Sequence, residues 1–284
     1  MSFVLVGFKT DQLILITIFS GLYLASQATR KFILGFSIFI VFWIIFDYMK
    51  AFPNYVFNDV HIKSLYDAEK SLFAIAQDGA WLTPNEYWKQ HHFLLGDVLA
   101  GIFYLCWVPV PLAFATYLYV KNRRQFLYFS LTFLLVNILG FILYYLYPAA
   151  PPWYVQQYGF DFRAATSGST AGLLQFDRFF NVTIFQSLYS KSSNVFAAMP
   201  SLHSAYPLIV LYFGLKNRLG WVNLLFLVIT IGIWLSAIYT SHHYVLDVLA
   251  GIVVAVIGIS LFSVILLHNK AMRKFMDRYI EIIS

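Results

Sequence analysis

Few charged side chains and a single cysteine distinguish this sequence of 284 residues. Asp, Glu, Lys and Arg make up 11% of it, against about a quarter of a typical soluble domain, which excludes an ordinary water-soluble fold. Hydrophobic residues make up 60%, which indicates that lipid is the solvent. The lone Cys106 excludes an internal disulfide. We expect no cleavable signal peptide, because the basic pair Arg30–Lys31 follows the first apolar stretch.

Seven apolar segments are long enough, or nearly so, to cross about 30 Å of hydrocarbon. They lie at 11–28, 32–49, 93–120, 125–147, 201–216, 221–240 and 243–267. The sequence therefore predicts an all-α integral membrane protein.

The net charge of +6 comes from basic residues in short connections between the apolar segments, at 29–31, 121–124, 217–220 and 268–284. Cytoplasmic loops of membrane proteins carry such an excess of Lys and Arg. We therefore expect these connections in the cytoplasm, no nucleic-acid partner, and the long loops 50–92 and 148–200 on the opposite side. That side is the periplasm if the membrane is a bacterial inner membrane, which we favour, or the lumen if it is Golgi or ER.

Two histidine-containing stretches open apolar segments on that opposite side. His243 and Asp247 are four residues apart, so on one helix they share a face, and Thr240 or Ser241 is suited to cap it. An Asp partner fixes the imidazole tautomer and makes the free nitrogen more basic, as a nucleophile that attacks phosphorus requires. The alternative is a polar pair that only anchors the end of a helix.

In the second stretch, Pro200 is suited to the first position of a helix. The amides of Ser201 and Leu202 then fall among the unpaired N–H groups of a helix start, which bind phosphate oxygens. His203 is placed to protonate a leaving oxygen and to deprotonate an acceptor. The alternative is ordinary helix capping.

The runs Pro200-Ser201-Leu202-His203 and His243-Tyr244-Val245-Leu246-Asp247 resemble the last two signature motifs of the type 2 phosphatidic acid phosphatase superfamily. The resemblance implies that His203 is a general acid and base, that His243 forms a phosphohistidine and that Asp247 orients it, with no metal or other cofactor. It also implies a six-helix catalytic domain at 32–267. An extra N-terminal transmembrane helix at 1–31 and a cytoplasmic basic tail at 268–284 complete the chain.

Two departures from the phosphatases concern their phosphate-binding cations. The chain has no Arg-Pro dipeptide, and Ser236-Ala237 stands where the phosphatases carry Ser-Arg. Instead, Tyr147 to Tyr154, Phe196 to Ser204 and the double-histidine form of the last motif resemble the inositol phosphorylceramide synthase branch. That branch implies transfer of a phosphoinositol headgroup from a phospholipid to ceramide or a similar lipid alcohol. A lipid phosphate or polyprenyl diphosphate phosphatase is the alternative, and a non-catalytic transporter or scaffold is a remote one.

Other polar residues are candidates for binding the charged substrate. Lys191, Arg178, Arg163 and His242 lie on the expected side, and each is also an ordinary loop residue. Asp97 lies within an apolar run, where an acidic side chain suggests function, although it is also placed to anchor the end of a span near His92. We expect Ser201, Lys191, His242, Asp97 and Arg178 to bind substrate.

Overall fold

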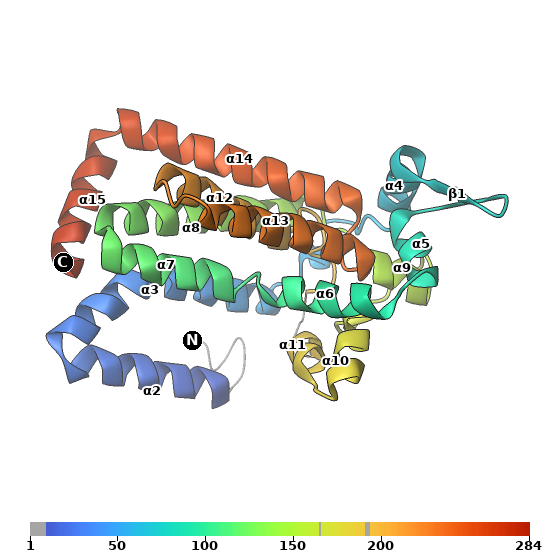
Figure 1. Cartoon of the computed structure of the whole chain (residues 1–284), viewed down its shortest axis with the longest axis horizontal. Helices are drawn as coiled ribbons and strands as arrows, with labels where there is room; N and C mark the ends of the chain where they lie inside the picture. Colours follow the sequence, from blue (N-terminus) through green and yellow to red (C-terminus); the bar gives the residue numbers. More distant parts are fainter. Residues whose placement is uncertain (1–9, 165, 191–193) are drawn as a thin grey trace.

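The computed structural model describes residues 10–164, 166–190 and 194–284, and it is built around long, nearly parallel helices (Figure 1). Lys191 lies outside the described residues. The long helices are α2 (Thr10–Ala25), α3 (Gln27–Tyr48), α6 (Leu94–Leu105), α7 (Pro109–Lys121), α8 (Arg123–Leu146), α12 (Leu202–Lys216), α13 (Val222–Tyr239) and α14 (Val245–His268). Their apolar surfaces and their positions agree with the expected helical membrane protein.

Five helical stretches among the described residues are long and apolar enough to cross a membrane. They are Gln27–Ala51, Leu94–Lys121, Arg123–Leu146, Val222–Tyr239 and Val245–Leu266. The other two expected spans form the shorter helices α2 and α12, of 16 and 15 residues. The division into six core spans and one additional span therefore stays a prediction.

The predicted span at 93–120 corresponds to one candidate membrane span, Leu94–Lys121, whose helix is interrupted between α6 and α7, which lie end to end (Figure 1). Pro109 is the first residue of α7 and Pro111 follows it. A proline lacks the amide hydrogen that would continue the ladder of the preceding helix, so helices tend to restart at such a residue. The break places Trp107 beside the site described below.

Shorter elements gather at one end of the bundle (Figure 1). The first long loop forms η1 (Met49–Ala51), η2 (Asn54–Val56), α4 (Lys63–Phe73), β1 (Ile75–Gln77), β2 (Ala80–Leu82) and α5 (Pro84–Gln90). The second forms α9 (Pro152–Tyr158), η3 (Ala171–Leu173), α10 (Leu174–Phe180) and α11 (Ile184–Ser190). Strands β1 and β2 make a small antiparallel hairpin that we did not predict, although its turn, Asp78-Gly79 with positive φ at both residues, is typical of tight hairpins.

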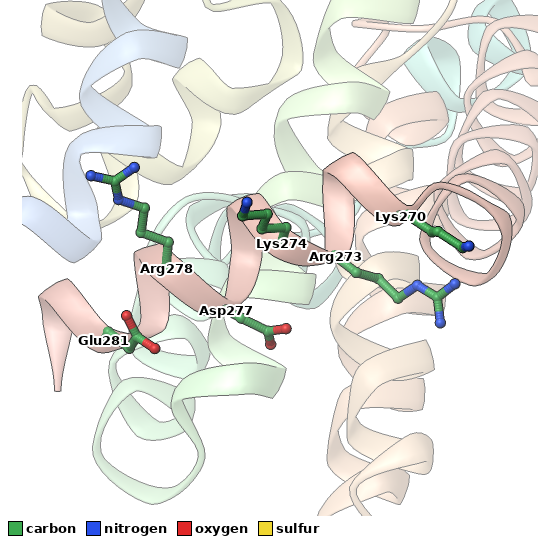
Figure 2. A pocket seen from close by; sticks show the side chains of 6 residues that line it. All are labelled: Lys270, Arg273, Lys274, Asp277, Arg278 and Glu281. Atoms are coloured by element: carbon green, nitrogen blue, oxygen red, sulfur yellow. The ribbon is translucent and has the colours of Figure 1, made fainter.

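The predicted basic tail at 268–284 contains a helix, α15 (Lys270–Ile283), that crosses the opposite end of the bundle (Figure 1). Its Met276 and Ile283 are buried, and Tyr279 donates a hydrogen bond to the carbonyl of Leu34 at 2.6 Å. Figure 2 shows its charged side chains, which line a shallow pocket: Lys270, Arg273, Lys274, Asp277, Arg278 and Glu281. The basic end and the end with the long loops are thus separated by the length of the bundle.

Candidate active site

The two predicted histidines face each other. His203 is the second residue of α12, and His243 lies in the connection between α13 and α14. The Nδ1 atom of His203 lies 3.2 Å from the Nε2 atom of His243. His243 is 5% exposed, and His203 is half-buried. Two segments that are forty residues apart in the sequence thus bring two proton-accepting nitrogens to one point.

Asp247 lies on the other side of the His243 ring, as predicted. Its Oδ2 atom is 3.5 Å from His243 Nδ1, and the carboxylate is fully buried. The expected shared helix is wrong, however, because α14 begins at Val245 and His243 precedes it. Asp247 is in the first turn of α14, where its Oδ2 atom accepts a hydrogen bond from the amide of Tyr244 at 2.8 Å. The carboxylate therefore caps the helix as well as facing the imidazole, and Nε2 is the nitrogen of His243 that faces His203.

The start of α12 differs from the sequence-based expectation in two respects. Helix α12 begins at Leu202, so Pro200 precedes the helix instead of occupying its first position. The amide of Ser201 donates a hydrogen bond to the carbonyl of Asp247 at 2.9 Å, so it is not a free phosphate donor. Ser201 instead joins the starts of α12 and α14, the two helices that hold the histidine pair.

A second contact reinforces this junction. The hydroxyl of Ser204 is within hydrogen-bonding distance of the carbonyls of Ser201 and Val248, at 2.7 and 3.1 Å. Gly251, one turn further along α14, has its α-carbon against the carbonyl of Ser201 and the hydroxyl of Ser204. Small residues permit helix backbones to approach this closely. The distance between His203 and His243 therefore depends on a tight contact between α12 and α14.

The loop that carries His243 is held by both long loops. Asn85 of α5 is fully buried, and its amide donates to the carbonyls of Ile238 and His243, at 2.8 and 2.9 Å. The amide of Trp153, in the Pro-Pro-Trp-Tyr segment, donates to the carbonyl of Ser241 at 3.0 Å. The amide of Gly172 donates to the carbonyl of Thr240 at 3.0 Å. The Pro-Pro-Trp-Tyr segment, Pro151 to Tyr154, thus supports the loop that carries His243.

Two aromatic residues of the site were missed by the sequence analysis. Tyr104 is fully buried on α6, and its hydroxyl lies 3.0 Å from His203 Nδ1. Trp107, in the break between α6 and α7, packs its ring edge-on to that of His203, with centroids 4.4 Å apart. Aromatic residues in an apolar run are ordinary core residues in sequence, so nothing singled them out.

His242 lies within the same cluster but does not contact Asp247. It is 5% exposed, and its Nδ1 atom is 3.0 Å from the hydroxyl of Thr240. Its ring lies between those of Tyr104 and Tyr189, with centroid distances of 5.2 and 4.6 Å. A role for His242 in substrate binding stays a prediction, which its place beside the histidine pair supports.

Other predicted substrate-binding residues lie away from the histidine pair or outside the described residues. Asp97 is paired with Tyr239, whose hydroxyl donates to Oδ1 at 2.9 Å, and with His92, whose Nδ1 atom is 3.3 Å from Oδ2. These contacts fit the alternative reading, an anchor at the end of a span. Arg178 is exposed on α10, and Arg163 is exposed with its guanidinium over the ring of Tyr158. Substrate binding by Asp97, Arg178 and Lys191 stays a prediction.

A buried glutamate also contacts this region and was not predicted. Glu69, on α4, is fully buried, and its carboxylate accepts hydrogen bonds from the amides of Val245 and Leu246 at 2.9 and 3.1 Å. Burial raises the pKa of Glu69 to about 7. A lone Glu in a polar loop carries no signal in sequence, because only the fold brings it to the start of α14.

Comparisons with known proteins agree with this geometry. The profile of the PAP2 superfamily matches residues 65–261, which include both histidines, Asp247 and Glu69. A phosphoinositol dihydroceramide synthase of Bacteroides thetaiotaomicron is 45% identical over 281 residues, which cover 98% of this chain and 92% of that protein. An inositol phosphorylceramide synthase of Candida albicans is 29% identical, over 60% of this chain and 37% of the fungal protein. The catalytic subunit of the Saccharomyces cerevisiae inositol phosphorylceramide synthase is 33% identical, over 42% of this chain and 30% of its own length. No solved structure matches.

Proposed function

This chain belongs to the PAP2 superfamily, and we propose that it is a membrane transferase that moves a phosphoinositol headgroup from a phospholipid to ceramide or dihydroceramide. The observation that carries the proposal is the approach of His203 Nδ1 to His243 Nε2 at 3.2 Å, with Asp247 on the far side of His243. The near full-length similarity to a phosphoinositol dihydroceramide synthase supports this choice of headgroup and acceptor.

In the first half-reaction, Nε2 of His243 attacks the phosphorus of the donor. The bond between phosphorus and the diacylglycerol oxygen breaks, and His203 supplies the proton that this leaving oxygen takes up. Asp247 faces Nδ1 of His243 and stabilises the positive charge that develops on the ring. The product of this step is a phosphoinositol group bonded to His243.

In the second half-reaction, the hydroxyl of the acceptor lipid attacks the same phosphorus. His203, now neutral, takes the hydroxyl proton, and the bond between phosphorus and Nε2 breaks, which restores His243. Tyr104 hydrogen-bonds the Nδ1 atom of His203 and so orients the ring in both steps. In the phosphatase alternative, the donor is a lipid phosphate or polyprenyl diphosphate, and water attacks the phosphohistidine in place of the lipid alcohol and releases inorganic phosphate.

The charge of the site favours a phosphodiester donor. Among the described residues, the side chains that contact the histidine pair come from Tyr104, Trp107 and Asp247, and no Arg or Lys is among them. A phosphodiester carries one negative charge at phosphorus, whereas a phosphomonoester carries nearly two at neutral pH. A histidine pair that no Arg or Lys of the described residues contacts therefore suits a diester such as phosphatidylinositol better than phosphatidic acid.

We further propose that the site faces the periplasm of a bacterial inner membrane. The histidine pair lies at the end of the bundle that carries the long loops, whereas the basic side chains of α15 lie at the other end (Figures 1 and 2). An excess of Lys and Arg on one side favours the cytoplasm for that side.

The purified protein, supplied with phosphatidylinositol labelled in its headgroup, tests the function directly. We expect a labelled lipid that forms only when ceramide or dihydroceramide is added, and label trapped on His243 when the acceptor is left out. The H243A variant is the control and should give neither product. Release of inorganic phosphate from simple phosphate esters, with no ceramide-dependent lipid product, would favour the phosphatase alternative.

A further inference from the structure

Glu69 meets the start of α14 from outside the long-helix bundle. Its two carboxylate oxygens accept the amides of Val245 and Leu246, the first two residues of that helix. The preceding amide, that of Tyr244, is accepted by Asp247. Three successive amides that directly follow His243 are thus held by two carboxylates, one from α4 and one from α14 itself.

Because Glu69 accepts two of these amides, the carboxylate of Asp247 remains available to face His243. The first amides of a helix have no partner within the helix, and a buried amide without an acceptor costs about 1–3 kcal/mol. Without an acceptor from α4, the amides of Val245 and Leu246 would compete for the carboxylate of Asp247, which already accepts the adjacent amide of Tyr244. A carboxylate that turns toward those amides turns away from Nδ1 of His243, which it now faces at 3.5 Å.

We propose that Glu69 is a positioning residue for the His243–Asp247 pair, which acts by occupying the helix amides that would otherwise compete for Asp247. The inference rests on the proposed function only in taking His243 as the nucleophile. It assigns a task in the active site to the first long loop, because α4 then controls the nucleophile through two hydrogen bonds to α14.

The electrostatic surroundings make this contact sensitive to pH. Asp247 and Tyr244 face Glu69 from the α14 side, and Tyr66 and Lys70 lie on α4. The hydroxyl of Tyr66 donates a hydrogen bond to Glu86 of α5 at 2.9 Å. The ammonium group of Lys70 donates a hydrogen bond to that same hydroxyl at 3.2 Å, so its charge lies against Tyr66. Burial, with the nearby charge of Asp247, raises the pKa of Glu69 to about 7. Protonation weakens its acceptance of the two amides, so the contact is strongest above neutral pH.

The test compares E69Q with E69D and with the control E86Q. Glu86 is suitable because it also caps a helix in the same loop, where its carboxylate accepts the amide of Thr83 at 2.8 Å. For E69Q at pH 8 we expect kcat to fall about 10-fold with KM within about twofold, because misplacement of a reacting group acts on turnover. The activity of the wild-type protein should fall as the pH is lowered through about 7, because protonated Glu69 accepts the two amides less strongly. This fall should be absent from E69Q. E69D should retain this pH dependence, and E86Q should behave as the wild type does.

Two further measurements keep the inference falsifiable if the assays fail. Infrared difference spectra of the wild type between pH 6 and pH 8 should show a protonated carboxyl band that titrates near pH 7 and is missing from E69Q. Labelling of His243 by the donor without acceptor should slow in E69Q, and this readout holds for a transferase and for a phosphatase alike. Wild-type labelling rates in E69Q, or equal losses in E69Q and E86Q, would overturn the inference. Absence of ceramide-dependent product from the wild type, with His243 still labelled, would instead overturn the proposed function alone.

Discussion

Replacement of Gly251 by alanine tests whether the contact between α12 and α14 sets the geometry of the active site. A methyl group at Gly251 would overlap the carbonyl oxygen of Ser201 and the hydroxyl of Ser204, and it would lie 3.0 Å from the carbonyl carbon of Ser201. The serine hydroxyl is able to rotate away. The carbonyl belongs to the backbone, whose amide is bonded to Asp247, so it is not free to do so.

The size of the effect follows from the overlap. Side-chain β-carbons essentially never approach other atoms within 3.0 Å, so the helix starts must separate by about 1 Å to admit the methyl group. His203 is two residues from Ser201 and would move with it, which lengthens its 3.2 Å approach to His243. A misplacement of about 1 Å in a catalytic group costs on the order of 100-fold in rate. Overpacking of a tight interface also destabilises a fold by about 1–3 kcal/mol.

The assay is the ceramide-dependent transfer rate, measured beside the melting temperature in detergent. G21A is the matched control, because a methyl group at Gly21 of α2 meets no atom within 4 Å. We expect G251A to lose about 100-fold in kcat while still melting cooperatively, and G21A to match the wild type. A G251A protein with the wild-type rate would refute the argument that this helix contact sets the distance between the histidines.

Four other predictions concern the site and its orientation. Y104F should lower kcat about 10-fold with KM unchanged, because it removes one hydrogen bond to His203 and alters no packing. Phosphatidylinositol should outcompete phosphatidic acid as a substrate, and EDTA should not inhibit; a strong preference for phosphatidic acid would favour a phosphatase. Cysteines introduced at Ser169 and Asn217 of a C106S protein should react oppositely with an impermeant reagent, and equal external labelling would contradict the topology. Because the pKa of Glu69 is raised from 4.5 to about 7, its contribution to stability is full below about pH 4.5 and is lost as the pH rises through 7. E69Q should therefore melt above the wild type at pH 8 and with it at about pH 4.5, and a constant difference would contradict this linkage.

Local patterns predicted much of the fold because the membrane restricts what a chain can do. Only helices and closed barrels satisfy every backbone group in lipid, so apolar segments of sufficient length translate into helices. The break between α6 and α7 was missed, although Pro109 marks it, because the mean hydropathy of a long segment changes little when one of its residues is a proline. The Asp78-Gly79 hairpin was missed because its strands have only three residues each. The start of α14 was misplaced because the four-residue spacing between His243 and Asp247 does not require both residues to lie on one helix.

The sequence by itself determined the class of the protein and predicted its reacting groups. His203, His243 and Asp247 stand in short motifs that carry the family resemblance, and that resemblance implies their roles. Tertiary structure decided which other residues serve them. Tyr104 reaches the site because α6 packs in the bundle beside α12, and Asn85 and Glu69 reach it because the first long loop folds over the end of the bundle. A single tyrosine, asparagine or glutamate has no periodicity or spacing to reveal it, so its role depends on contacts that only the folded chain creates.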